Sequence, residues 1–204
     1  MELLTYDFIN ITPTSAELVL NWEKKQFPVK IEFAVDDIVV ANAEAELKGA
    51  IGFGAPAYLS AANSTLANNT HLEQGLAWVD QSILRNKTFN ALNTKSGILK
   101  KMGKTEEGEK IMTEAVAIAT EVELNNYGYQ LINQGQNDKA IEVLAMNTKR
   151  FPKSANAWDS LGEAYAVKGD KDNAIKNFKK ALSLNPAPNI KANSEKFLKQ
   201  YGAL

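Results

Sequence analysis

Side chains that could carry out catalysis are scarce in this sequence. The chain has no cysteine and a single histidine, His71, in the polar stretch 68–71. Without cysteine, disulfides, thiolate metal sites and cysteine nucleophiles are excluded, and a serine nucleophile has no well-placed histidine to act as its base. We expect His71 to be a turn residue before a helix. The sequence therefore predicts no catalytic residue, no metal site and no cofactor, and a protein that is not an enzyme.

Two pairs of neighbouring carboxylates and one glycine-rich loop have simpler explanations than chemistry. The acidic pairs at 36–37 and 106–107 open stretches of helical pattern, where the helix dipole favours negative charge. Glycines at Gly49, Gly52 and Gly54 are in the wrong order for a phosphate-binding loop, and no strand immediately precedes them. We expect the acidic pairs to begin helices and the loop to be a linker.

The composition and charge of the chain indicate which kinds of partner it can attract and whether it is soluble. The 204 residues are 45% hydrophobic and carry 23 basic against 24 acidic side chains, a net charge of −1, so no bulk field attracts nucleic acid. Acidic residues dominate 1–50 and lysines 149–204, and we interpret both as solvated surface. No apolar run is long enough to span a membrane, and the N-terminus lacks the pattern of an export signal. We expect a soluble chain.

A repeat of 34 residues organises the second half of the chain. Its clearest copy, 155–188, carries large and small apolar residues at fixed places, namely Trp158, Leu161, Gly162, Tyr165, Ala174, Phe178 and Ala181, and Pro186 ends it. Moving back 34 residues to 121–154 finds the same classes, for example Leu124, Gly128 and Leu144. Small residues let two helices approach closely while large ones fill the space around them. The spacing predicts stacked helical hairpins.

Weaker copies of this pattern lie before the two clear ones, and a polar helix follows them. A third copy of the repeat is predicted at 89–120 and a degenerate fourth copy at 56–88. The predicted repeat region is therefore 56–188. Residues 189–204 indicate a largely polar helix in which Phe197, Leu198 and Tyr201 are apolar. Such a helix is suited to cap the last interface of a stack.

The first 55 residues follow a different period. Apolar residues alternate in 18–22 and again in 29–33, which predicts a β-hairpin turning at 23–26. Residues 5–10 can add a third strand, and such a small sheet with one apolar face needs a partner surface. The segment 1–35 is therefore expected to be a short β segment, with a helix and glycine-rich linker in 36–55. Because the helical repeats make up most of the chain and the β segment is short, the predicted fold class is mainly α.

Polar positions between the core residues of the first helices are the best candidates for binding. Stacked hairpins turn these positions toward a shared groove. An asparagine amide both donates and accepts hydrogen bonds, so it can bind the backbone of an extended peptide whatever the peptide's side chains. The candidate groove residues are Asn90, Asn93, Lys100, Asn125, Tyr129, Asn133, Asp159 and Glu163.

The repeat residues resemble the tetratricopeptide repeat family over about 56–188. The resemblance implies a right-handed superhelix of antiparallel helix pairs with a scaffold function. Members that grip carboxylate tails use Lys and Arg in the groove, whereas most candidate positions here are neutral or acidic. The arrangement of 12–31 before the helices also resembles the C-terminal part of a bacterial family known as domain of unknown function 2911. That resemblance implies a larger β-sandwich, an export signal and a periplasmic or secreted location.

Three hypotheses for function follow from these patterns. The first is a non-catalytic scaffold that binds a peptide or protein in the groove. In the second, the β strands pair by their edges, which would make a homodimer. The third is an accessory or substrate-binding part of an enzyme, which requires a pocket around Trp22, Phe53 and Tyr58.

Overall fold

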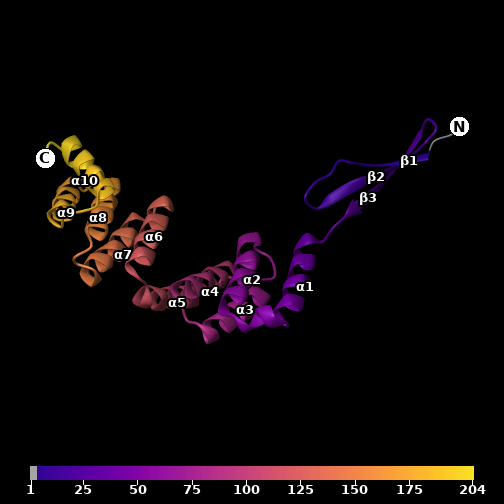
Figure 1. Cartoon of the computed structure of the whole chain (residues 1–204), viewed down its shortest axis with the longest axis horizontal. Helices are drawn as coiled ribbons and strands as arrows, with labels where there is room; N and C mark the ends of the chain where they lie inside the picture. The colour runs from indigo at the N-terminus through magenta and orange to yellow at the C-terminus, as the bar shows by residue number, and fades with distance from the viewer. Residues whose placement is uncertain (1–3) are drawn as a thin grey trace. The chain divides into compact units, whose positions relative to one another are not determined.

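The chain forms helices and one small sheet, as the computed structural model in Figure 1 shows. The structure describes residues 4–204. The mainly α fold class with a short N-terminal antiparallel sheet is confirmed. Two compact units divide the described residues: the first holds 4–87 and 94–108, and the second holds 88–93 and 109–204. The boundary between the two units crosses the helices of the third repeat.

The sheet has three antiparallel strands in the order β1 (Leu4–Ile9), β2 (Ser15–Trp22) and β3 (Lys25–Glu32). Strands β2 and β3 pair from Ser15 opposite Glu32 to Trp22 opposite Lys25. Their turn is tighter than the sequence indicates, because only residues 23–24 connect the strands. The first of these turn residues, Glu23, has a φ of 54°.

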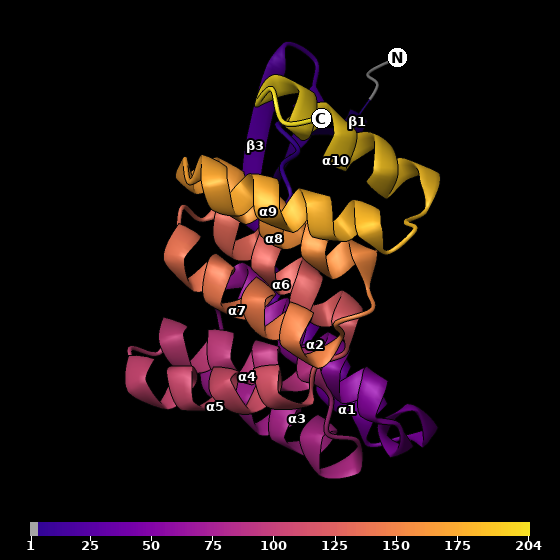
Figure 2. The same ribbon diagram turned by 90° about the vertical axis from the view of Figure 1, so that its left-hand side faces the viewer.

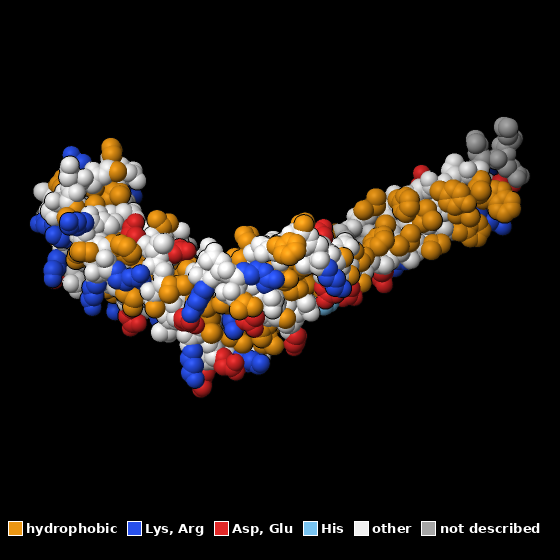
Figure 3. All heavy atoms as spheres, turned by 60° about the horizontal axis from the view of Figure 1, so that its bottom comes forward, with side chains coloured by type: hydrophobic (Ala, Val, Ile, Leu, Met, Phe, Trp, Pro, Cys, Tyr) orange, Lys and Arg blue, Asp and Glu red, His pale blue; other side chains and the backbone are white. Residues whose placement is uncertain are grey.

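The two faces of the sheet differ in chemistry. Opposite residues of an antiparallel pair share a face, so the register assigns every side chain. One face, here called the apolar face, consists of Leu4, Tyr6, Phe8, Ala16, Leu18, Leu20, Trp22, Phe27, Val29 and Ile31, with Lys25 at one end. The other face is largely polar, and there Asn21 Nδ2 donates to Asp7 Oδ2 over 2.7 Å. Hydrophobic side chains crowd along the strands in Figure 3.

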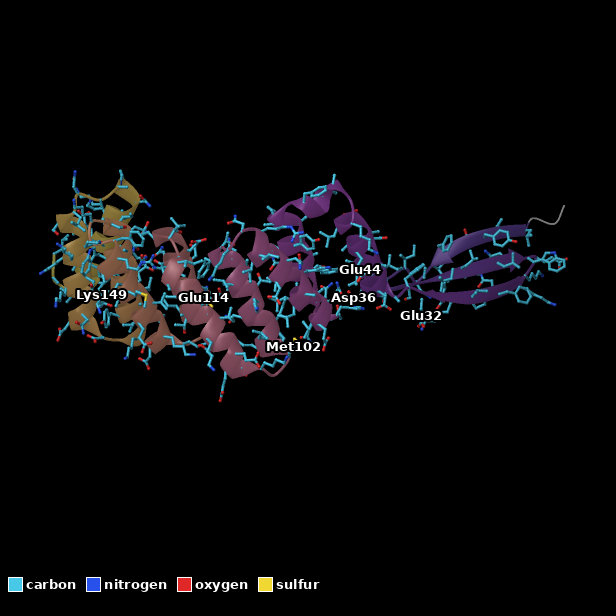
Figure 4. The ribbon with its side chains drawn as sticks, turned by 90° about the horizontal axis from the view of Figure 1, so that it is seen from below. Glu32, Asp36, Glu44, Met102, Glu114 and Lys149 are labelled. Carbon is cyan, nitrogen blue, oxygen red and sulfur yellow. The ribbon has the colours of Figure 1, made fainter. Side chains whose placement is uncertain are left out.

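Helix α1 (Val35–Leu47) follows the sheet. Figure 4 labels Glu32 at the end of β3 and Asp36 in the first turn of α1. The 3-10 turn η1 (Ala50–Phe53) and the antiparallel pair α2 (Ala55–Asn68) and α3 (Leu72–Arg85) come next. The first turn of α1 is held by the corner between α2 and α3. There Asn68 Nδ2 donates to Asp36 Oδ1 over 3.1 Å, and His71 Nε2 lies 2.8 Å from Asp37 Oδ1.

His71 precedes α3 in the left-handed conformation, with a φ of 50°, so it is the turn residue that the sequence predicts. Its Nδ1 is buried and has no hydrogen-bond partner in the described chain. No group of three or more His, Cys, Asp or Glu side chains in residues 4–204 is placed to hold a metal ion.

Helices α4 to α9 form three pairs in the order of the repeats, and α10 follows the last pair. Their bounds are α4 (Phe89–Lys101), α5 (Thr105–Ile118), α6 (Glu121–Asn133), α7 (Asn137–Arg150), α8 (Ala155–Lys168), α9 (Lys171–Ser183) and α10 (Pro188–Gln200). Glycine allows the closest approaches. A Cβ added at Gly128 would lie 2.5 Å from Cγ of Leu144, and one at Gly162 would lie 2.8 Å from the ring of Phe178. Each approach joins the first helix of a pair to its second.

Helix α10 packs on the last pair, and Figure 2 shows it beside α9. The rings of Phe178 and Phe197 stack with centroids 4.8 Å apart, and Leu198 is buried at 1% exposure. Apolar burial of this kind is the main force that holds one helix to the next. In the described residues, no helix is both long enough and apolar enough to cross a lipid bilayer.

Candidate functional site

The predicted groove residues all lie on the first helices of their pairs. Asn90, Asn93 and Lys100 are on α4, Asn125, Tyr129 and Asn133 are on α6, and Asp159 and Glu163 are on α8. Lys100 belongs to the first unit and the other seven to the second. The stem of Lys100 lies across α5, because a Cβ added at Gly108 would be 2.8 Å from Cγ of Lys100.

Asp159 is buried in a hydrogen-bond network between α8 and α10. Its side chain accepts from Asn193 Nδ2 over 2.8 Å and from Ser194 Oγ, and Asn193 Nδ2 also donates to Glu163 Oε1 over 2.5 Å. Asp159 is only 5% exposed and Ser194 is fully buried. The carboxylate of Asp159 is therefore occupied by groups of its own chain.

Burial governs the ionisation of this network. Loss of solvent raises the pKa of the Asp159 carboxyl above its usual value, the hydrogen bonds from Ser194 and Asn193 lower it in part, and the nearby Glu163 charge raises it again. Tyr129 OH lies 3.2 Å from Ser160 Oγ. Burial, as the largest cause, also raises the pKa of Tyr129. This phenol stays protonated at neutral pH, and its one hydrogen is donated to Ser160 Oγ.

Helix α6 presents a more open polar surface than α8. Its exposed positions include Asn126, Gln130 and Asn133, and Val122 beside them is 60% exposed. No charged side chain occurs between Glu123 and Asp138. We call Asn125, Asn126, Tyr129, Gln130 and Asn133 the α6 amide surface. Sequence reasoning missed Asn126 and Gln130, although the same uncharged run is visible in the sequence.

One further atom of this surface lacks a partner. Asn125 Oδ1 is buried, and no group of the described chain donates a hydrogen bond to it. Position 125 corresponds to Asp159 one repeat later, whose carboxylate accepts hydrogen bonds from Asn193 and Ser194 of α10. The amide oxygen of Asn125 on α6 can therefore still accept a hydrogen bond, whereas the carboxylate of Asp159 on α8 already does so within the chain.

The first unit contains a cavity of about 400 Å³ between α1 and α2. Its lining is mostly apolar and includes Val39, Leu47, Ile51, Ala61 and Trp78. Of the three residues predicted to surround an enzyme pocket, Tyr58 lines a smaller neighbouring pocket with Trp78. Phe53 is 85% exposed and Trp22 is 53% exposed.

A family model described as "Tetratricopeptide repeat" matches residues 155–188, the segment that forms α8, α9 and their flanking turns. Residues 155–188 form a tetratricopeptide repeat. The close approach at Gly162 and Phe178 lies inside this repeat. The resemblance of the chain to domain of unknown function 2911 stays a prediction.

Curated relatives match over a stretch of similar size. The "Cellulose synthase operon protein C" of Escherichia coli K12 is 41% identical over 59 residues, which are 29% of this chain and 5% of that protein. The human "Superkiller complex protein 3" is also 41% identical over 59 residues, 29% of this chain and 4% of that protein. The matched stretch is a small part of both relatives.

Two solved structures are similar over more of the chain. A structure titled "Crystal structure of YrrB: a TPR protein with an unusual peptide-binding site" covers 78% of this chain and 90% of its own, with 19% identity and a TM-score of 0.45. A structure of pilF from Pseudomonas aeruginosa covers 75% of this chain and 71% of its own, with 18% identity and a TM-score of 0.45.

Proposed function

We propose that the second unit is a non-catalytic scaffold that binds an extended segment of a partner protein on the α6 amide surface. Tetratricopeptide repeats are in general protein-interaction scaffolds, because stacked hairpins expose a continuous row of first helices. The proposal extends that general role to a particular surface of this chain.

The observation that carries the proposal is the exposed, uncharged and amide-rich side of α6. Three side-chain amides, of Asn126, Gln130 and Asn133, are exposed there. Each amide can donate and accept, which suits the alternating N–H and C=O groups of an extended backbone. Along the chain, no charged side chain occurs between Glu123 and Asp138. The charges that act on Tyr129 from outside this run are those of Glu163 and Asp159 on α8.

The surroundings of the surface support the same partner chemistry. Val122 offers an exposed apolar contact beside the amides. The Tyr129 hydroxyl donates its one hydrogen to Ser160 Oγ, so only its oxygen can serve a partner, as an acceptor. Glu163 is engaged by Asn193, and Asp159 is buried. We therefore leave Asp159 out of the proposed contact set and keep Asn125, Tyr129 and Asn133 from the predicted residues.

The experiment selects binders from a display library of random peptides on the whole chain and measures their affinity by fluorescence anisotropy. The test variant is Asn126→Asp with Gln130→Glu, which keeps shape but replaces amide donors by charge. We expect it to weaken binding about tenfold or more, since each lost hydrogen bond leaves a desolvated group. The control Asn189→Asp changes an exposed amide on α10 and should leave affinity unchanged.

Backbone recognition makes a second prediction about the peptide itself. Methylation of the peptide's backbone nitrogens should weaken binding, whereas exchanging its side chains should matter less. If the selected peptides bind the double variant as tightly as the wild-type chain, or if selection yields no binder, the α6 amide surface is not the site.

A further inference from the structure

The apolar face of the sheet is the largest group of exposed hydrophobic side chains on adjacent elements of the first unit. Leu4, Tyr6, Phe8, Trp22, Phe27 and Val29 are each between 47% and 62% exposed. All six belong to the same face by the strand register. The face is partly covered along the middle strand, where Ala16 is buried at 8% exposure, and at Ile31 of β3, which is half-buried.

An isolated sheet of this kind is poorly stabilised in water. Three strands need a hydrophobic face packed against something to hold together, and exposed apolar patches of several hundred Å² mark interaction sites. Since side chains of this size bury roughly 150–250 Å² each when covered, half exposure of six of them leaves roughly 600 Å² of uncovered surface. Within residues 4–204, most of this face therefore has no cover.

That area fits a second copy of the same face. Two such faces packed together would bury roughly 1,200 Å² in total, which reaches the size of a specific protein interface. Flat apolar sheets stack about 10 Å apart with strands nearly aligned, so the face is complementary to itself. Lys25 is the only charged residue assigned to it, and its place at one end keeps the lysines of two copies off the centre of a two-fold interface.

Pairing by strand edges accounts for these observations less well. The edge strand β3 contains Pro28, which has no N–H to donate, and it carries Lys25 and Lys30, a residue type that discourages edge pairing. Edge pairing would also leave the six apolar side chains in water. Stacking of the faces covers them and leaves the edges free.

We propose that two copies of this chain associate by packing their apolar faces together into a six-stranded sandwich. The interface uses the N-terminal sheet, so it is independent of the α6 amide surface. Each copy keeps its helical repeats outside the interface, and the dimer presents two copies of the repeat surface.

The test measures the mass of the whole chain by sedimentation equilibrium over a wide concentration range. The two variants are Val29→Thr, which keeps the β-branched shape but adds a hydroxyl to the interface, and Phe27→Lys, which adds a charge. The control is Gln26→Lys, since Gln26 is exposed, neighbours Phe27 and lies on the opposite face. We expect a concentration-dependent dimer that Val29→Thr weakens about tenfold, that Phe27→Lys abolishes and that Gln26→Lys retains.

Two further signals separate face stacking from edge pairing. Stacking buries Trp22 and shifts its fluorescence to shorter wavelength with increasing concentration, whereas the outward amides of β1 and β3 keep exchanging with solvent. Protection of those edge amides without a Trp22 shift would overturn the proposal. So would a chain that stays monomeric at every concentration, including one that binds lipid vesicles instead, or a dimer unaffected by Val29→Thr.

Discussion

Replacing Ser194 by alanine tests whether α10 is held to α8 by its bond to a buried carboxylate. The Ser194 hydroxyl is fully buried and donates to Asp159 Oδ1. The variant removes this donor and little else, since serine and alanine differ by one oxygen atom. Asn193 remains as a donor to the other oxygen of Asp159.

The expected cost at neutral pH is about 1.5–3 kcal/mol of unfolding free energy, the range for hydrogen bonds to charged groups. The cost depends on pH because the pKa of Asp159 is raised in the folded chain, mainly by burial. When the pKa of a carboxyl is higher in the folded chain than in the unfolded chain, its contribution to stability is fully present at a pH below the unfolded-state pKa. That contribution is lost as pH rises through the folded-state pKa. Without Ser194, that folded pKa rises further. The difference between variant and wild type should therefore widen as pH rises and shrink in acid.

Urea unfolding of both chains at neutral and mildly acidic pH measures this difference, with hydrogen exchange of the α10 amides as a local readout. Ser183→Ala is the matched control, because Ser183 is exposed and its hydroxyl bonds only to Lys180 O of its own helix. The control should change stability by less than about 0.5 kcal/mol. If Ser194→Ala behaves like the control at neutral pH, or if its cost grows in acid, the reasoning about Asp159 is wrong.

Two other substitutions probe contacts between helices. Gly162→Ala places a Cβ 2.8 Å from the ring of Phe178 and should destabilise the chain by about 1–3 kcal/mol through overpacking; unchanged urea unfolding would contradict the close approach. Arg150→Lys loses a fork that donates from Nη1 to Val116 O and from Nη2 to Ala119 O. Lysine cannot reproduce that geometry, so we expect faster hydrogen exchange of the backbone amides at the end of α5. Equal exchange in both chains would contradict a role of Arg150 in holding this helix end.

The sequence predicted most of the helices because the repeat constrains them twice. Gly162 and Phe178 recur as Gly128 and Leu144 one period earlier, and each pair makes the close contact that its spacing requires. Helix ends followed from local signals of the same kind. Gly169 ends α8 with a φ of 83°, a conformation that glycine adopts without strain.

Side-chain accessibility was harder to predict than backbone structure. Asp159 occupies a polar position of a first helix, and that position alone predicts an exposed side chain. Its actual exposure depends on whether the following helix covers it. The sequence did not predict this cover, because α10 is largely polar and such a helix is expected to face solvent. The uncovered sheet face, in contrast, was foreshadowed by the alternation of the strands, although the register that unites Tyr6, Trp22 and Phe27 came only with the structure.

The repeat period explains why α10 both continues the stack and closes it. Adding 34 to Asp159 and Ser160 gives Asn193 and Ser194, which bond to Asp159 of the preceding level. The same step from Gly162 and Tyr165 gives Lys196 and Lys199. The residues that face α8 therefore keep their repeat character, whereas the positions that would contact a second helix carry charge and are exposed. Charged lysines there would have to be desolvated for another helix to pack, so the face of α10 opposite the stack favours water over a further repeat.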